Sequence, residues 1–116
     1  MALAATYGFT ADQGATFSQV ITWKDSTNSP IDLTGYTARM QIRQKVTSSV
    51  SLSLTTENNR ITLGGDAGTI ALSITSSDMA DLPAGSYTYD LELVSVSGDV
   101  SRLLMGTFVV RSEVTR

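Results

Sequence analysis

The chain has 116 residues, no cysteine and no histidine. This is the length of one domain, and it is enough to bury a core without disulfides. The missing residue types exclude Ser-His-Asp and Cys-His catalysis and zinc sites that need Cys or His. The net charge of −3, from 8 basic and 11 acidic residues, does not favour the clustered basic field that captures nucleic acid.

The composition favours β-structure. Only 16% of the residues are charged, whereas 15 are serine and 16 are threonine. Threonine is β-branched and serine competes with helical hydrogen bonds, so both residue types suit strands and turns better than helices. We therefore expect an all-β protein that forms a single domain over residues 1–116, with residues 1–10 as an arm or a first strand.

Alternation of apolar and polar residues predicts the strands. A weak first strand covers about residues 4–9. Alternation then predicts strands at 16–24, 36–43, 50–55, 61–63, 70–75 and 87–93, and a last strand runs from about residue 100 to residue 111. Seven or eight short strands separated by turn signals indicate an antiparallel β-sandwich, with an up-and-down barrel as the alternative.

The connections carry turn residues. Asn59 and the glycines of 64–68 lie where a turn needs residues that tolerate positive φ. Ser97-Gly98-Asp99 predicts a hairpin between the last two strands. One short helical turn is expected near 76–82, where a Ser or Asp caps the turn and Pro83 ends it.

A local motif narrows the fold class. The stretch Asp81-Leu-Pro-Ala-Gly-Ser-Tyr-Thr-Tyr89 looks like the tyrosine corner of immunoglobulin-like domains. In that motif a tyrosine at the start of a strand, here Tyr87, hydrogen-bonds back to the preceding turn. Tyr89 stands where antibody domains have a cysteine. The motif therefore favours an immunoglobulin-like fold of the non-antibody kind.

Charged residues alternate on two of the predicted strands. Arg39 and Arg43 project from one strand, and Asp90 and Glu92 project from another. In an immunoglobulin-like sandwich these strands are neighbours in one sheet, where opposite charges contribute about 0.2–1 kcal/mol each. Two interpretations remain open: a solvated ladder that fixes the register, and a polar rim of a docking surface.

The last predicted strand is apolar on both faces. One face carries Leu103, Met105 and Val109, and the other carries Leu104, Phe108 and Val110. A sandwich strand needs only one apolar face. Three explanations remain open: a bulge at Gly106 that switches the two faces, a cover formed by the N-terminal segment, or a contact with another chain. In the last case Leu103, Met105 and Val109 are the docking residues.

No catalytic, cofactor-binding or metal site is predicted, and we expect no enzymatic activity. The aspartates fall in loops, where the side chain ordinarily bonds to nearby backbone amides. A carbohydrate-binding or host-adhesion module is the alternative function, and it would use exposed aromatic side chains. Its candidates are Tyr7, Trp23 and Tyr36, of which Trp23 and Tyr36 alternate with the apolar residues and favour a core role.

Several segments together resemble a widespread group of small tailed-phage and prophage virion proteins. They are 17–25, 30–43 with Ile-Asp-Leu-Thr-Gly-Tyr, 61–63, 68–72, 82–93 with Leu-Pro-Ala-Gly-Ser-Tyr, and 102–108. The pattern is also similar to the N-terminal immunoglobulin-like domain of baseplate upper proteins. The resemblance extends from about residue 11 to residue 116.

The resemblance implies a structural or adaptor part of a phage particle, in the tail, baseplate or neck or at a fibre attachment. It implies docking onto other virion subunits. We also expect several copies or a symmetric homo-oligomer, without cofactors, nucleic acid or membrane. The N-terminus has no positively charged stretch and only a short apolar run, so we expect no signal peptide. The expected location is the virion, after synthesis in the host cytoplasm.

Overall fold

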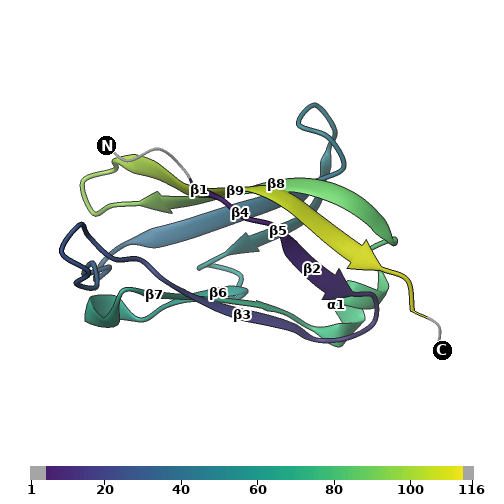
Figure 1. The fold of residues 1–116 in the computed structure, drawn as a ribbon, viewed down its shortest axis with the longest axis horizontal. Helices are drawn as coiled ribbons and strands as arrows, with labels where there is room; N and C mark the ends of the chain where they lie inside the picture. The colour runs from purple at the N-terminus through teal and green to yellow at the C-terminus, as the bar shows by residue number, and fades with distance from the viewer. Residues whose placement is uncertain (1–4, 114–116) are drawn as a thin grey trace.

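Two β-sheets pack face to face in the computed structural model, which describes residues 5–113 (Figure 1). The large sheet contains, in spatial order, β1 (Ala5–Thr6) and β2 (Phe9–Asp12), β9 (Val100–Arg111), β8 (Gly85–Val94), β4 (Thr37–Arg43) and β5 (Val50–Thr55). The small sheet contains β3 (Phe17–Thr22), β7 (Thr69–Ile74) and β6 (Ile61–Leu63). The predicted two-layer β architecture is confirmed, and the sheets do not close into a barrel.

The large sheet is mixed rather than antiparallel throughout. β1 and β2 lie one after the other along the same edge of β9, and both run parallel to it. They therefore act as one interrupted edge strand, which gives eight strand positions in the two sheets. The expectation of a wholly antiparallel sandwich is wrong at this edge, because the chain enters alongside its own last strand before it crosses to the small sheet. Residue 4 of the predicted 4–9 strand lies outside the described residues.

The helical turn predicted near 76–82 is α1 (Ser76–Ala80). Its N-cap is Thr75, whose hydroxyl accepts a hydrogen bond from the Asp78 amide at 3.2 Å. A single-turn 3-10 helix, η1 (Gly65–Ala67), joins β6 to β7, and Gly65 and Gly68 have positive φ as the turn signals predicted. Within residues 5–113, no helix is long and apolar enough to span a membrane.

The core lies between the inner faces of the two sheets. β4 and β8 alternate strictly, so every second side chain is buried and the others face solvent. Phe108 on β9 is fully buried and packs against the rings of Phe9 and Phe17, with centroids 6.2 and 5.2 Å away. These contacts join β2, β3 and β9, and thereby hold the two sheets together at this side.

Two tyrosines of β8 donate hydrogen bonds to backbone carbonyls outside their own strand. The Tyr87 hydroxyl donates to the Pro83 carbonyl at 2.6 Å, so the predicted bond to the preceding turn is present. The Tyr89 hydroxyl donates to the Tyr7 carbonyl at 2.7 Å, between β1 and β2. Tyr89 therefore ties the interrupted edge strand to the core.

Alkaline pH is expected to destabilise the fold through Tyr89. Burial of its hydroxyl, assisted by the nearby Tyr7, raises the pKa of Tyr89 to about 12. The unfolded chain releases this proton near pH 10, so the stabilisation is complete below pH 10 and is lost as the pH rises to about 12. The loss is at most about 2–3 kcal/mol, because solvent near the hydroxyl screens part of the effect. Urea unfolding at a series of pH values measures it.

Tyr89→Phe is the matched control, because it removes the phenolic proton and keeps the ring. This variant is expected to lose the Tyr89 part of the pH dependence between pH 10 and 12. The same steepness in Tyr89→Phe as in the original chain would contradict the assignment.

β9 changes face at Leu103. The pairing with β8 places Leu91 opposite Leu104 but Glu92 opposite Arg102, so Leu103 is an extra residue in a bulge. Beyond the bulge Leu104, Phe108 and Val110 face the core. The bulge expected at Gly106 thus lies three residues earlier, because the register adjusts where β9 meets the end of β8 that leads into the hairpin.

Candidate docking face

The outer face of the large sheet, which we call the docking face, brings together most of the residues predicted as an interface. Strand alternation turns Arg39, Gln41 and Arg43 of β4 outward, while the side chains between them enter the core. On β8 the same alternation turns Asp90 and Glu92 outward. β4 and β8 are antiparallel neighbours, so these side chains share one surface.

Two ion pairs cross this face. Arg39 lies directly opposite Glu92, and its Nε is 2.8 Å from the Glu92 Oε1. Asp90 lies opposite Gln41, and its Oδ2 is instead 3.4 Å from the Nε of Arg102 on β9. The predicted ladder between β4 and β8 is therefore present as one pair, and the second pair joins β8 to β9. Exposed pairs of this kind add about 0–1 kcal/mol, so they fix register more than they stabilise.

Arg43 does not pair with a carboxylate of β8. Its position opposite Thr88 leaves no acid across the strand. Its Nη1 donates to the Ser48 carbonyl at 2.6 Å, and its Nη2 donates to the Gln41 Oε1 at 2.7 Å. Arg43 therefore braces the β4–β5 hairpin at the border of the docking face. This differs from its expected place in a ladder with the acids of β8.

Two of the three predicted apolar docking residues lie on this face. Met105 is 42% exposed, and Val109 is half-buried with its side chain on the outer side of β9. Leu103 instead packs against the core. Sequence alternation placed it on the same face as Met105 and Val109, but the bulge turns its side chain away from that face. The expected grouping of Leu103 with Met105 and Val109 is thus wrong for Leu103.

The docking face is hollowed beside Met105. A depression of about 360 Å³ lies between Met105, Arg43 and Val46, the last at the tip of the β4–β5 hairpin. A second depression, of about 260 Å³, continues over Arg39 and Glu92. The two share Gln41 and Asp90 in their linings. Together they form a shallow groove across β4, β8 and β9.

Sequence reasoning missed two members of this groove. Val46 is 80% exposed. The sequence feature that could have identified it is that it is a lone valine among the polar residues of 44–49. Arg102 contributes a guanidinium that alternation along β9 could not place, because its direction depends on the bulge at Leu103.

Several aspartates have structural partners. Asp25 Oδ1 accepts hydrogen bonds from the Thr27 hydroxyl and amide and from the Ser29 amide, and these bonds hold the pKa of Asp25 below its usual value. Asp32 accepts the hydroxyl and amide of Thr34 in the same way, and its pKa is also lowered. The predicted role of loop aspartates is confirmed for these two. Within residues 5–113, no three His, Cys, Asp or Glu side chains group as metal ligands would.

The three aromatic candidates differ in exposure. Trp23 and Tyr36 are half-buried and pack against the core, as their alternation predicted. Tyr7 is 51% exposed and lies at the edge of the large sheet, away from Trp23 and Tyr36 in sequence and in strand position. The described residues therefore provide no platform of several exposed aromatic rings.

The docking face combines apolar side chains with a charged border. Met105 and Val46 supply exposed apolar surface, and the two ion pairs lie beside them. Methionine and arginine are enriched in protein–protein contacts, where the border is polar and the centre loses its water. No protein-family model matches this chain, and no curated protein sequence matches it either.

Proposed function

We propose that the chain is an immunoglobulin-like domain. The order β3-β7-β6 corresponds to strands B, E and D of that fold, and β9-β8-β4 corresponds to G, F and C with β5 as the added strand C′. The hydrogen bond from Tyr87 to Pro83 lies where that fold has its tyrosine corner. These two features support the assignment independently of each other.

We further propose that the protein is a non-enzymatic structural or adaptor component of a tailed-phage particle. The observation that carries the proposal is the docking face, where an exposed methionine lies in a groove bordered by ordered ion pairs. The resemblance of the sequence to the N-terminal domain of baseplate upper proteins supports the same function. Phage particles are built from subunits in cyclic arrays, so the chain acts in several symmetry-related copies.

Docking buries Met105 and Val46 and keeps the ion pairs at the border. Removal of the apolar side chains from water supplies the favourable free energy. The charged border contributes specificity, because a wrong partner would leave Arg39, Asp90 or Glu92 beside a like charge. Arg43 holds the hairpin that carries Val46, so it sets the shape of the groove.

Incorporation into particles tests the function. We expect the protein in purified particles of the phage or prophage that encodes it, and Met105→Asp is expected to reduce its incorporation by about tenfold or more. The introduced carboxylate would be on the exposed side of β9 but opposite Asp90, so circular dichroism and urea unfolding of the variant check that the fold is retained. Thr62→Asp is the control, because Thr62 is exposed on the small sheet.

Three outcomes decide the proposal. If Met105→Asp is depleted from the particles while Thr62→Asp is incorporated normally, the result supports docking through the outer face of the large sheet. Absence of the unchanged protein from purified particles overturns the structural role. Equal incorporation of both variants overturns the docking face as the contact.

A further inference from the structure

Within residues 5–113, β3 pairs with β7 on one side only, and the hydrogen-bonding groups of its other edge can be assigned. Trp23 donates its amide to the Gly68 carbonyl at 2.8 Å, and the register continues through Ile21 opposite Ile70. In an antiparallel ladder alternate residues bond to the neighbour, and those between them point to the other side. The amides and carbonyls of Ser18, Val20 and Thr22 therefore face away from β7, toward the free edge.

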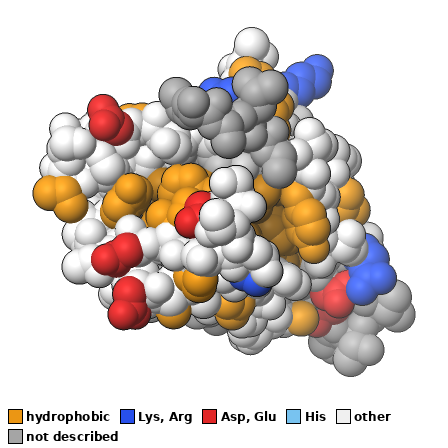
Figure 2. Space-filling model, turned by 60° about the vertical axis from the view of Figure 1, so that its left-hand side comes forward, with side chains coloured by type: hydrophobic (Ala, Val, Ile, Leu, Met, Phe, Trp, Pro, Cys, Tyr) orange, Lys and Arg blue, Asp and Glu red, His pale blue; other side chains and the backbone are white. Residues whose placement is uncertain are grey.

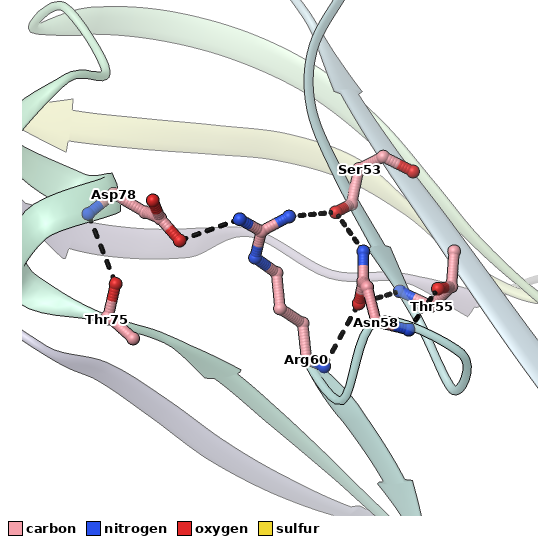
Figure 3. Close-up of polar contacts among 6 residues, drawn as sticks. All are labelled: Ser53, Thr55, Asn58, Arg60, Thr75 and Asp78. Carbon is pink, nitrogen blue, oxygen red and sulfur yellow. Dashed lines mark hydrogen bonds and ion pairs between the residues drawn. The ribbon is translucent and has the colours of Figure 1, made fainter.

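The free edge of β5, at the far side of the large sheet, is blocked by its own turn (Figure 3). The Ser53 carbonyl accepts from the Asn58 Nδ2 at 3.0 Å and from the Arg60 Nη1 at 2.8 Å. The Thr55 amide donates to the Asn58 Oδ1 at 2.9 Å. Arg60 is held in place by Asp78 of α1, at 2.7 Å. Side chains thus occupy the Ser53 carbonyl and the Thr55 amide, two of the groups that an added strand would use.

The described part of the chain gives β3 no equivalent protection. Among the described residues, no side chain hydrogen-bonds to the backbone of Phe17–Thr22. The strand contains no proline and no charged residue, which are the usual means of blocking an edge. Val20 on the outer side of the strand is 64% exposed. A six-residue neutral edge with an exposed valine is a template for strand addition.

The side of the sandwich next to this edge is open. A hollow of about 240 Å³ lies between β3 and the edge strand of the large sheet, lined by Tyr7, Phe9, Gln19, Val20, Ile21 and Leu104. Figure 2 shows hydrophobic side chains exposed in the middle of the molecule. Gln19 has the inward direction of Phe17 and Ile21 but is exposed, because no strand of the described chain covers this side.

We infer that β3 pairs antiparallel with β3 of a second copy, around a two-fold axis at Val20. In this register Val20 lies opposite its own copy, and Ser18 lies opposite Thr22 in both directions, so all three outward residues pair with outward residues. The two small sheets become one continuous sheet. Strands in a sheet lie about 4.8 Å apart, so Gln19 and Ile21 of the second copy extend over the open side of the first.

The edge itself favours a second copy over another occupant. A two-fold contact requires one patch to be complementary to itself, and the sequence Ser-Gln-Val-Ile-Thr meets this requirement because it brings no like charges together. The valine pair and the two Ser–Thr pairs are favourable cross-strand neighbours. This edge belongs to the small sheet, so the contact leaves the docking face of the large sheet free.

Solution mass tests the inference on the full chain. We expect light scattering after size exclusion to give twice the chain mass at high protein concentration. Val20→Lys is expected to shift the protein to monomer, because two lysines would meet at the axis. The control Thr62→Lys places the same charge on the exposed side of β6, two strands from the edge, and is expected to remain dimeric.

Cross-linking tests the register. The chain has no cysteine, so Val20→Cys provides one thiol per chain. Opposite residues of a hydrogen-bonded antiparallel pair have Cα atoms about 5.5 Å apart, within the range of a disulfide. Oxidation is expected to produce a covalent dimer of Val20→Cys and none of Thr62→Cys.

The outcomes separate this inference from the proposed function. A monomer at all concentrations, with no cross-linking of Val20→Cys, overturns the β3 contact even if Met105→Asp is lost from particles. Dimerisation that Thr62→Lys disrupts as strongly as Val20→Lys also overturns it. Val20→Lys monomers that still enter particles confirm that the two surfaces act separately.

Discussion

Phe108→Ala is expected to lower the free energy of unfolding by about 3–5 kcal/mol. The ring is fully buried and contacts Phe9 and Phe17, which come from different sheets. Truncation therefore removes apolar contact and leaves a cavity at the place where β2, β3 and β9 meet. Domains of this size have a total stability of about 5–15 kcal/mol, so the variant loses a large part of it. Urea unfolding followed by the fluorescence of Trp23 gives the value.

The neighbouring residue provides the matched control. Val109 lies on the docking face of the same strand, and Val109→Ala is expected to cost less than about 1 kcal/mol in the isolated protein. The pair of variants measures which face of β9 enters the core. Equal losses would mean that both faces are covered within one copy, and the apolar part of the docking face would then have no role in contacts with other proteins.

The strands that sequence predicts best are those with one buried face. β4 and β8 lie in the middle of the large sheet with their outer sides in solvent, so burial alternates along each of them and the apolar residues follow. The same reasoning predicts Tyr87, since its bond to Pro83 spans only four residues. Local patterns are sufficient for these features because one buried face recurs at every second residue and the Tyr87 bond joins residues close in sequence.

β9 shows where local patterns are insufficient. Its alternation depends on the bulge at Leu103, and the bulge arises from pairing with β8. A one-residue change of register moves every following side chain to the other face. Sequence therefore indicated that both faces of β9 are apolar, but it could not decide that Leu103 belongs with the core and Met105 with the outer side.

The edges of the sheets were also difficult to predict. The first strand is predicted to end near residue 9. In the structure the strand is interrupted after Thr6 and resumes as β2 (Phe9–Asp12). In β3, Gln19 points inward and Val20 points outward, opposite to the usual preference. Edge strands have fewer neighbours that enforce burial, so their sequences are less constrained by the fold of a single copy and can serve contacts with another.

The docking face was predictable to the level of strand pairs. Arg39 and Glu92 meet because β4 and β8 are neighbours, which the fold class implied. The partners of Asp90 and Arg43 required the register, which places Gln41 and Thr88 opposite them. Side-chain direction follows from alternation, but the choice among several nearby partners depends on three-dimensional position.

Gly106→Ala is expected to destabilise the protein by about 2–5 kcal/mol, through backbone strain and overpacking together. Gly106 has φ +154°, a conformation that residues with a side chain rarely adopt. A Cβ at this position would also overlap the carbonyl oxygen of Tyr7, which accepts the hydrogen bond of Tyr89. The substitution must therefore move β1 away from β9 or break the bond to Tyr89. Urea unfolding measures the loss.

Gly85→Ala separates the two causes. Gly85 lies in the same sheet with φ +152°, but a Cβ there would meet no atom within 4 Å. Its substitution is expected to cost only the backbone strain, about 1–3 kcal/mol. The difference between the variants measures the close approach of the edge strand to β9. Equal losses would show that the Tyr7 backbone moves away from residue 106 without a measurable loss of stability. Tyr89→Phe would then add its full effect to that of Gly106→Ala. If the approach is rigid, the two effects overlap instead, because both variants release the same carbonyl of Tyr7.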